Sequence, residues 1–258
     1  MGNKSFLITL KDLPSIEIMI PVLNEEVDLP ICVETLMHFC NKFMSSYDWK
    51  ITTVDNGSTD KTLEIAKALS EKHREVDLIR LEERGRGRAL RHAWVGSRAE
   101  VVAYMDVDLS TDLMALPTSV SLVQTGQCDI AIGSRLVRGS EVIGRSLKRS
   151  IISHVYSLLF RSLFWTNFKD AQCGFKVLSR EVVDDVIPLT QSTGWFFDTE
   201  FLLIASDNAY KIHEIPVKWT DDPDTRVKII STALEDIKGL LRLRFGGLSR
   251  ARKALVQR

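Results

Sequence analysis

An apolar run that ends in two acids constrains the fold of this chain more than any other segment. Residues 101–105 are predominantly apolar, and they are followed by Asp106 and Asp108, one residue apart. Such a run is typical of a strand that is buried on both faces of a sheet, so the acids are expected at the edge where the strand ends. Two carboxylates at the start of a loop suit a divalent cation that carries a diphosphate.

Strand-like and helix-like patterns alternate before this point. They predict, in chain order, strand 16–21, helix 29–43, strand 51–54, helix 61–72, strand 76–81, helix 87–98 and strand 101–105. This alternation is typical of an α/β fold with a mostly parallel central sheet and helices on both faces. Ligands of such sheets bind outside the carboxyl ends of the strands, so polar residues after successive strands are expected to share one crevice.

Composition narrows the class of protein further. The chain has 258 residues, of which 45% are hydrophobic, and this suits one large α/β domain. A formal net charge of zero argues against a globally basic nucleic-acid-binding protein, so no nucleic acid is expected as a partner. The four cysteines form no CxxC pair and the N-terminus shows no secretory signal pattern, so a cytoplasmic location is predicted.

Two segments are predicted to contact a membrane without spanning it, because no run approaches the roughly 18 apolar residues of a membrane span. Residues 151–165 have a wide apolar helical face flanked by basic residues, and residues 237–258 contain seven Lys or Arg and no acid. We therefore divide the chain into a domain at 1–228 and a basic amphipathic helical tail at 229–258. Peripheral attachment to anionic lipid at the inner, cytoplasmic face of the membrane is expected, with an ordinary solvated terminus as the alternative for the tail.

Four ordered motifs resemble those of the inverting family 2 glycosyltransferases, and the resemblance covers roughly residues 16–227. They lie at 21–26, 54–60, 106–108 and 172–176, and within the family they are most similar to polyprenyl-phosphate and dolichyl-phosphate hexose (mannose or glucose) synthases. The resemblance implies a single GT-A domain, which is a Rossmann-like nucleotide-diphospho-sugar transferase fold. It also implies transfer of a hexose from UDP-glucose or GDP-mannose to a polyprenyl or dolichyl monophosphate, with inversion and with Mg²⁺ or Mn²⁺.

The resemblance assigns a nucleotide site and a metal site to particular residues. The residues expected at the nucleotide are Pro21, Asn24, Glu25, Asp55, Asn56 and Asp106. Asp106 and Asp108 are the expected metal ligands, and both are therefore candidate catalytic residues. Asn56 stands where many members carry a second Asp, and Ser110 stands where some synthases carry a Gln ligand. Asp55 has an alternative role, because an acid at this place can simply stabilise the turn.

The resemblance also predicts where the acceptor and the sugar bind. Arg135, Arg149, Ser153 and Arg226 are expected to hold phosphate, and Gln172, Gly174 and Trp195 are expected to line the sugar and acceptor pocket. Asp198 is a second catalytic candidate. From the residues alone, Arg149 can also be part of a basic surface pair with Lys148, and Trp195 can be a core residue. The basic turn at 84–88 can either approach a phosphate or remain solvated.

Three other functions fit part of the pattern. A soluble glycan or small alcohol as acceptor would require a general base, for which Asp198 is the candidate. The DxD segment also fits the nucleophile motif of haloacid-dehalogenase-type phosphatases, although several strand–helix units precede it here. A nucleotide-sugar-binding module without turnover is the third. The sequence does not predict the donor or the oligomeric state.

Overall fold

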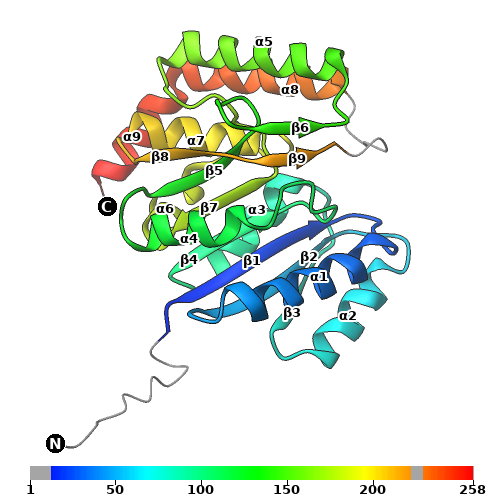
Figure 1. Cartoon of the computed structure of the whole chain (residues 1–258). Coiled ribbons are helices and arrows are strands. Elements are labelled where there is room, and N and C mark those ends of the chain that lie inside the picture. Colours follow the sequence, from blue (N-terminus) through cyan, green and yellow to red (C-terminus); the bar gives the residue numbers. More distant parts are fainter. Residues whose placement is uncertain (1–12, 222–228, 258) are drawn as a thin grey trace, which may run out of the picture.

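The protein is described here by a computed structural model that covers residues 13–221 and 229–257 (Figure 1). Its centre is a seven-stranded sheet in the order β3-β2-β1-β4-β7-β5-β8. Six strands run in one direction. These are β1 (Ser15–Val22), β2 (Asp48–Asn56), β3 (Val76–Leu81), β4 (Val101–Met105), β5 (Ile130–Ser134) and β8 (Ile212–Pro216). The predicted mostly parallel sheet is therefore confirmed.

Helices cover both faces of this sheet. One face packs against α1 (Asp28–Phe43), α2 (Thr62–Lys72) and α4 (Ala115–Gln124), and the other against α3 (Arg86–Gly96), α6 (Arg180–Asp185) and α7 (Phe197–Asp207). Alternate residues of a strand point to opposite faces. In β1, Ile18 and Ile20 accordingly belong to one apolar cluster, while Met19 belongs to the other. The two clusters bury the sheet on both sides, which explains why its strands read as apolar runs.

The strand β7 (Phe175–Ser179) runs against all its neighbours, between β4 and β5. Its first residue, Phe175, pairs with Met105, the last residue of β4. The beginning of an antiparallel strand lies at the edge where its parallel neighbours end. The residues just before β7 therefore reach the same edge as Asp106, and the backbone N–H of Asp106 donates to Gly174 O at 3.2 Å.

A further layer lies at the β8 end of the sheet. It contains α5 (Leu147–Phe164), α8 (Ile229–Arg242), the short turn η3 (Leu243–Gly247), α9 (Leu248–Val256) and a small parallel pair formed by β6 (Glu141–Ile143) and β9 (Lys218–Thr220). The helices α5 and α8 lie side by side (Figure 1), and Tyr156 of α5 interacts with Asp236 of α8. Leu240, Leu243 and Ala251 are buried in one of the two main clusters, so α8 and α9 pack on the sheet domain.

The limits of the predicted elements agree closely with the structure where side-chain periodicity defines them. The strands at 76–81 and 101–105 have the predicted ends, whereas β2 extends beyond 51–54 in both directions. The helix expected at 151–165 begins earlier, at Leu147, because Ser146 precedes it as an N-cap whose hydroxyl accepts from the N–H of Arg149. Because Ser146 is polar, the periodicity of apolar residues does not reveal this helix start.

Trp94 of α3 packs against α7, and its replacement tests the contribution of this packing to stability. Its indole is fully buried, and its ring centre lies 5.7 Å from those of Tyr104 and Phe201 and 5.8 Å from that of Phe197. Replacing a buried Trp by Ala removes apolar contacts and leaves a cavity, so Trp94→Ala should lower the free energy of unfolding by about 3–5 kcal/mol in urea denaturation. The matched control is Val95→Ala, at an exposed neighbour, which should change it by less than about 0.5 kcal/mol. Similar effects for both variants would contradict this packing role.

Candidate active site

The first two loops at the carboxyl edge of the sheet are hydrogen-bonded to each other. Asn24, which follows β1 with a positive φ of 57°, accepts from the N–H of Thr59 at 2.8 Å and donates its own N–H to Ser58 Oγ at 3.0 Å. The N–H of Glu25 donates to Thr62 Oγ1 at 2.7 Å. The structure thus brings these two predicted nucleotide residues against the turn that follows β2.

Asp55 and Asn56 end β2 in that same turn. Asp55 is fully buried, and its Oδ1 accepts from the N–H of Ser58 at 3.3 Å. Its Oδ2 lies 3.6 Å from Arg80 Nη1 and has no hydrogen-bond donor among the described residues. Asn56 Oδ1 accepts from the N–H of Gly85 at 2.8 Å, which joins the turn to the start of α3. A buried carboxylate oxygen without a donor is suited to accept a hydrogen bond from a ligand.

Pro21 lies one strand away, paired with Val54 in the β1–β2 ladder. Pro21 is therefore the second-last residue of β1 and lies beside the end of β2, as expected for a residue that shapes the first loop. The nucleotide roles of Pro21 and of its neighbours stay predictions.

A partly buried network of charged groups lies at the ends of β4 and β7. Arg86, at the start of α3, donates to Asp106 Oδ1 and to Asp198 Oδ2, both at 2.6 Å. Asp198 Oδ1 accepts from the hydroxyl of Tyr104 at 2.8 Å and lies 2.8 Å from Lys176 Nζ. One arginine therefore joins β4, α3 and α7, and its partners are 20 and 112 residues away in the sequence.

The network keeps Asp198 ionised. Burial by itself would raise the pKa of this carboxyl, but Lys176 and Arg86 hold it below its ordinary value. Burial also raises the pKa of Tyr104 well above its ordinary value, so Tyr104 stays a hydroxyl donor. Since both oxygens of Asp198 face donors from the protein, its direct role is to orient Arg86. Its catalytic role stays a prediction.

The surroundings of Asp106 explain two of the predicted pocket residues. A Cβ on Gly174 would lie only 1.7 Å from Asp106 Oδ2, so glycine leaves room for this carboxylate. Trp195 is 38% exposed, and its ring centre lies 4.8 Å from the guanidinium carbon of Arg86. That distance is typical of a cation–π contact. Trp195 is thus a cover over Arg86 rather than a core residue.

Asp106 and Asp108 have the chemistry that a magnesium or manganese ion requires. Asp106 uses one oxygen for Arg86, while Asp108 is exposed and its Oδ1 accepts from the N–H of Ser110 at 2.9 Å. No group of three His, Cys, Asp or Glu within residues 13–221 and 229–257 is placed to hold a metal. Mg²⁺ commonly uses one or two carboxylates together with substrate phosphates, so two aspartates at this edge fit such an ion.

Three of the four predicted phosphate-binding residues lie in a separate group of charges near α5. Arg135, just after β5, forms a two-pronged pair with Asp170, with both distances 2.8 Å. Arg149 pairs with Asp221 after β9. Ser153, one helical turn beyond Arg149, accepts instead from Arg145 Nη2 at 2.5 Å. Arg226, the fourth predicted residue, lies outside the described residues.

The helix α8 packs against the segments that carry Gln172 and Trp195. Gln172, a predicted pocket residue, donates to both carboxylate oxygens of Asp236 at 3.1 Å. Glu235 accepts from the N–H of Phe196 at 3.3 Å, in the turn that carries Trp195. A Cβ on Gly239 would lie 2.2 Å from the ring of Phe196, so the helix approaches this turn closely.

Several residues of the site were not singled out by the sequence. They are Arg86, Tyr104, Arg145, Asp170, Lys176 and Asp236. For Arg86 a signal existed, because glycines flank it. A Cβ on Gly85 would lie 2.6 Å from Thr193 O, and one on Gly87 would lie 2.4 Å from Phe197 Cβ. Tyr104, Asp170, Lys176 and Asp236 bind partners far along the chain, which one sequence does not reveal. The partner of Arg145, Ser153, is only eight residues away, but no sequence motif marks this pair.

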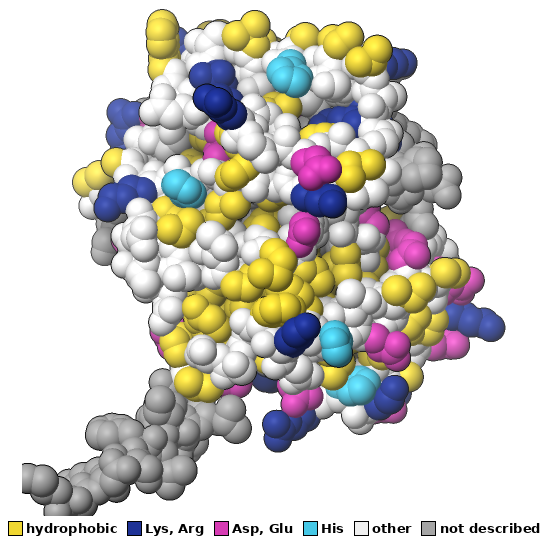
Figure 2. Space-filling model, viewed as in Figure 1, with side chains coloured by type: hydrophobic (Ala, Val, Ile, Leu, Met, Phe, Trp, Pro, Cys, Tyr) yellow, Lys and Arg dark blue, Asp and Glu magenta, His cyan; other side chains and the backbone are white. Residues whose placement is uncertain are grey.

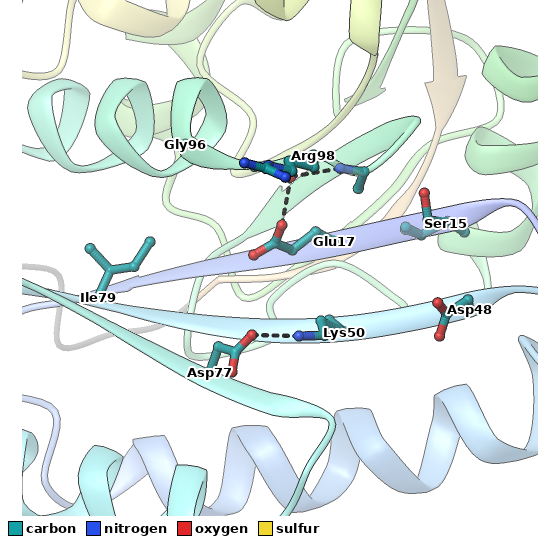
Figure 3. Close-up of a pocket in the computed structure, with 11 residues that line it drawn as sticks. Ser15, Glu17, Asp48, Lys50, Asp77, Ile79, Gly96 and Arg98 are labelled. Carbon is teal, nitrogen blue, oxygen red and sulfur yellow. Dashed lines mark hydrogen bonds and ion pairs between the residues drawn. The ribbon is translucent and has the colours of Figure 1, made fainter. Parts of the chain in front are cut away.

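A cavity of about 380 Å³ lies at the opposite edge of the sheet, at the amino ends of β1, β2 and β3 (Figure 3). Three of its charged side chains already have partners in the protein, since Lys50 pairs with Asp77 at 2.8 Å and Glu17 accepts from the hydroxyl of Ser97 at 2.5 Å. Ligands of α/β sheets bind at the carboxyl ends of the strands. The site at Asp106 therefore remains the candidate active site.

Comparisons with known proteins agree with this geometry. Residues 17–187 match the family model described as glycosyl transferase family 2. The chain is 30% identical to dolichyl-phosphate beta-glucosyltransferase of Mus musculus, over 97% of this chain and 82% of that protein. It is also 27% identical to the protein of the same name from Dictyostelium discoideum, over 89% of this chain and 74% of that protein.

Two further similarities support less specific conclusions, because one covers a small part of the relative and the other has low sequence identity. Glycosyltransferase AglD of Haloferax volcanii is 30% identical over 85% of this chain, but the match spans only 35% of that protein. A solved structure of glucosyl-3-phosphoglycerate synthase from Mycobacterium tuberculosis, in complex with Mn²⁺, UDP-glucose and phosphoglyceric acid, has a TM-score of 0.68. It is 16% identical, and the alignment covers 92% of this chain and 82% of that one. This second similarity concerns the fold, and it confirms the expected GT-A domain.

Asp236 gives the site a testable pH dependence. Burial raises the pKa of its carboxyl to about 7, and Glu235 and Asp198 act in the same direction. An unfolded Asp titrates near pH 4, so the folded protein holds an extra proton between about pH 4 and pH 7, and stability must fall as the pH rises through this window. Asp236→Asn, which is always neutral, should therefore gain stability relative to the wild type between pH 5 and pH 8 in urea denaturation.

The exposed Glu71→Gln serves as the control for this measurement, since it also replaces a carboxyl by an amide. A stability difference between Asp236→Asn and the wild type that is the same at pH 5 and pH 8 would show that Asp236 does not titrate in this window.

Proposed function

The chain belongs to glycosyl transferase family 2, and on this premise we propose that it transfers glucose from UDP-glucose to a dolichyl or polyprenyl monophosphate with inversion. Membership of the family identifies the enzyme as a glycosyltransferase and not a phosphatase. The names of its relatives favour glucose over mannose, and the bound UDP-glucose of the structural neighbour supports the donor.

The observation that supports a polyprenyl monophosphate as the acceptor is that α5 has one charged side and one apolar side. Its inner side bears Arg149 and Ser153, within the group of charges near Arg135. Its outer side exposes apolar residues three or four positions apart, which are Leu147, Ile151, Val155 and Leu158. A polyprenyl monophosphate has the same division, with an anionic head and an apolar chain. The helix thus offers both parts of such an acceptor a matching surface.

Neighbouring elements extend the apolar surface. Leu234, Ile237 and Leu241 of α8 are exposed, as is Phe245 in the following turn. Figure 2 shows hydrophobic side chains along the top of the molecule, where α5 lies in Figure 1. Within the described part of the chain, no helix is long and apolar enough to cross a membrane. We propose that this surface rests on the membrane that holds the acceptor; its cytoplasmic side stays a prediction.

At the donor end, Asp55 would accept a hydrogen bond from the nucleotide through its Oδ2, which has no hydrogen-bond donor among the described residues. Asn24, Glu25 and Asn56 would shape the loops around it. Asp106 and Asp108 would hold Mg²⁺ or Mn²⁺, which when bound neutralises charge on the diphosphate. Arg86, oriented by Asp198, holds Asp106 in place at this position.

The chemistry then requires orientation more than proton transfer. A phosphate monoester has its second pKa near 6, so the acceptor oxygen is already anionic at about pH 7. This oxygen would form a bond to the anomeric carbon while the bond from that carbon to the diphosphate breaks, and the electron pair leaves with UDP. The arginines near α5 would position the acceptor phosphate. A general base is unnecessary, which agrees with the ion pairs that engage Asp198.

The first experiment measures transfer from radiolabelled UDP-glucose and GDP-mannose to polyprenyl phosphate, with Mg²⁺ or Mn²⁺ and with EDTA. Label from UDP-glucose should enter the organic phase only with a metal ion. Asp108→Asn should retain less than about 1% of this activity, because it removes a charged ligand of the diphosphate-bound ion. Asp112→Asn, in the same loop, is the control. Label that enters only soluble acceptors would refute the lipid acceptor, and full activity of Asp108→Asn would refute its metal role.

Membrane contact is tested separately with vesicles that contain anionic phospholipid. Leu158→Glu places a charge in the centre of the exposed apolar face of α5, so the protein should no longer float with the vesicles. Val95→Glu, at an exposed position of α3 on the opposite part of the sheet, should float like the wild type. Equal flotation of the two variants would refute this surface as the membrane contact.

A further inference from the structure

Among the described residues, the group of charges beside α5 contains one guanidinium that forms no ion pair with a carboxylate. Arg135 is paired with Asp170, and Arg149 is paired with Asp221. Arg145 lies between β6 and α5, and its Nη2 donates to the neutral hydroxyl of Ser153. Its Nε is buried and has no hydrogen-bond acceptor among the described residues, and no carboxylate there forms an ion pair with it.

The electrostatic surroundings of Arg145 agree with this imbalance. Burial, and then the positive charge of Arg135, lower the pKa of Arg145, and Arg149 adds to the effect. Asp170 and Asp221 act in the opposite direction without reversing the shift. An arginine nevertheless remains protonated in proteins, so the charge persists. The described part of this group therefore contains three guanidiniums and two carboxylates, and it can accept one more anion.

The geometry also indicates what kind of anion fits. The Ser153 hydroxyl accepts from Arg145, so its own proton remains available to a ligand oxygen. Arg145 keeps donors available because one of its five N–H groups is used by Ser153. Several converging donors around one uncompensated positive charge suit a phosphate monoester. The same helix carries the outward apolar residues Leu147 and Ile151, where a lipid chain could lie.

We propose that Arg145 binds the acceptor phosphate. It supplies the net positive charge, because the charges of Arg135 and Arg149 are balanced by Asp170 and Asp221. The proposal rests on the proposed function, because it assigns the acceptor of that reaction to a residue outside the predicted set. In this arrangement Ser153 connects Arg145 to α5, and the two salt-bridged arginines flank the proposed phosphate position. Arg145 is a binding residue here and takes no proton during the reaction.

The variants Arg145→Gln and Arg145→Lys test this role, with Arg138→Gln as the matched control. Arg138 is an exposed arginine of the same β5–β6 segment. Loss of a charged hydrogen-bond donor should raise the KM for polyprenyl phosphate roughly tenfold to a hundredfold in Arg145→Gln, with the KM for UDP-glucose unchanged. Arg145→Lys should lie between, because it keeps the charge but loses the planar fork. Arg138→Gln should behave like the wild type.

Thermal unfolding separates binding from a structural role. Arg145 has no ion pair in the described structure, so Arg145→Gln should keep or raise the melting temperature. A lower melting temperature, together with equal losses in the KM of donor and acceptor, would show a structural role and overturn the proposal. An unchanged KM for polyprenyl phosphate in Arg145→Gln would overturn it as well.

Calorimetry with soluble probes identifies the part of the acceptor that Arg145 recognises. Wild-type protein should bind farnesyl monophosphate more tightly than inorganic phosphate, and Arg145→Gln should weaken both while leaving farnesol binding unchanged. An equal loss for farnesol, which has no phosphate, would overturn the proposal. A wild-type protein that binds farnesyl monophosphate no better than farnesol and glucosylates no lipid phosphate would refute the proposed function itself. An active wild type with an indifferent Arg145→Gln would refute only the role of Arg145.

Discussion

The salt bridges of Arg86 are the interaction on which the arrangement of the active site depends. A buried guanidinium is tolerated only with charged partners, and Arg86 has two, Asp106 and Asp198. These partners belong to the end of β4 and the start of α7, so one side chain fixes the relative position of three elements. The close approach also explains the small residues nearby, because a Cβ at Gly87 or Gly174 would collide with Phe197 or Asp106.

The reversed strand β7 gives that network its remaining members. Because β7 begins where β4 ends, the segment before it brings Gly174 to Asp106, and the strand itself places Lys176 beside Asp198. Gln172, a few residues earlier, reaches Asp236 on α8. A parallel strand at the same place would begin at the opposite edge of the sheet, far from the acids. The antiparallel direction is thus a requirement of the site.

The outer layer links the two environments that the proposed lipid acceptor would need. The helices α5 and α8 expose apolar residues on one side and hold polar contacts to the site on the other. On α8, Glu235 binds the turn that carries Trp195, which covers Arg86. On α5, Ser153 binds Arg145 next to the salt-bridged arginines. The proposed membrane surface and the proposed phosphate-binding group therefore share the helix α5.

The sequence by itself determined the α/β class, most strand and helix positions, and the place of Asp106 and Asp108, because burial periodicity and strand-end acids are local signals. Motif resemblance added the family, and it predicted the residues that would surround the donor. Only the tertiary structure decided the direction of β7, the pairing of Arg86 with Asp198 and the lack of an ion pair for Arg145 among the described residues. The physical reason is that the interactions of a charged side chain depend on its neighbours in space, and most of these neighbours come from segments far apart in the chain.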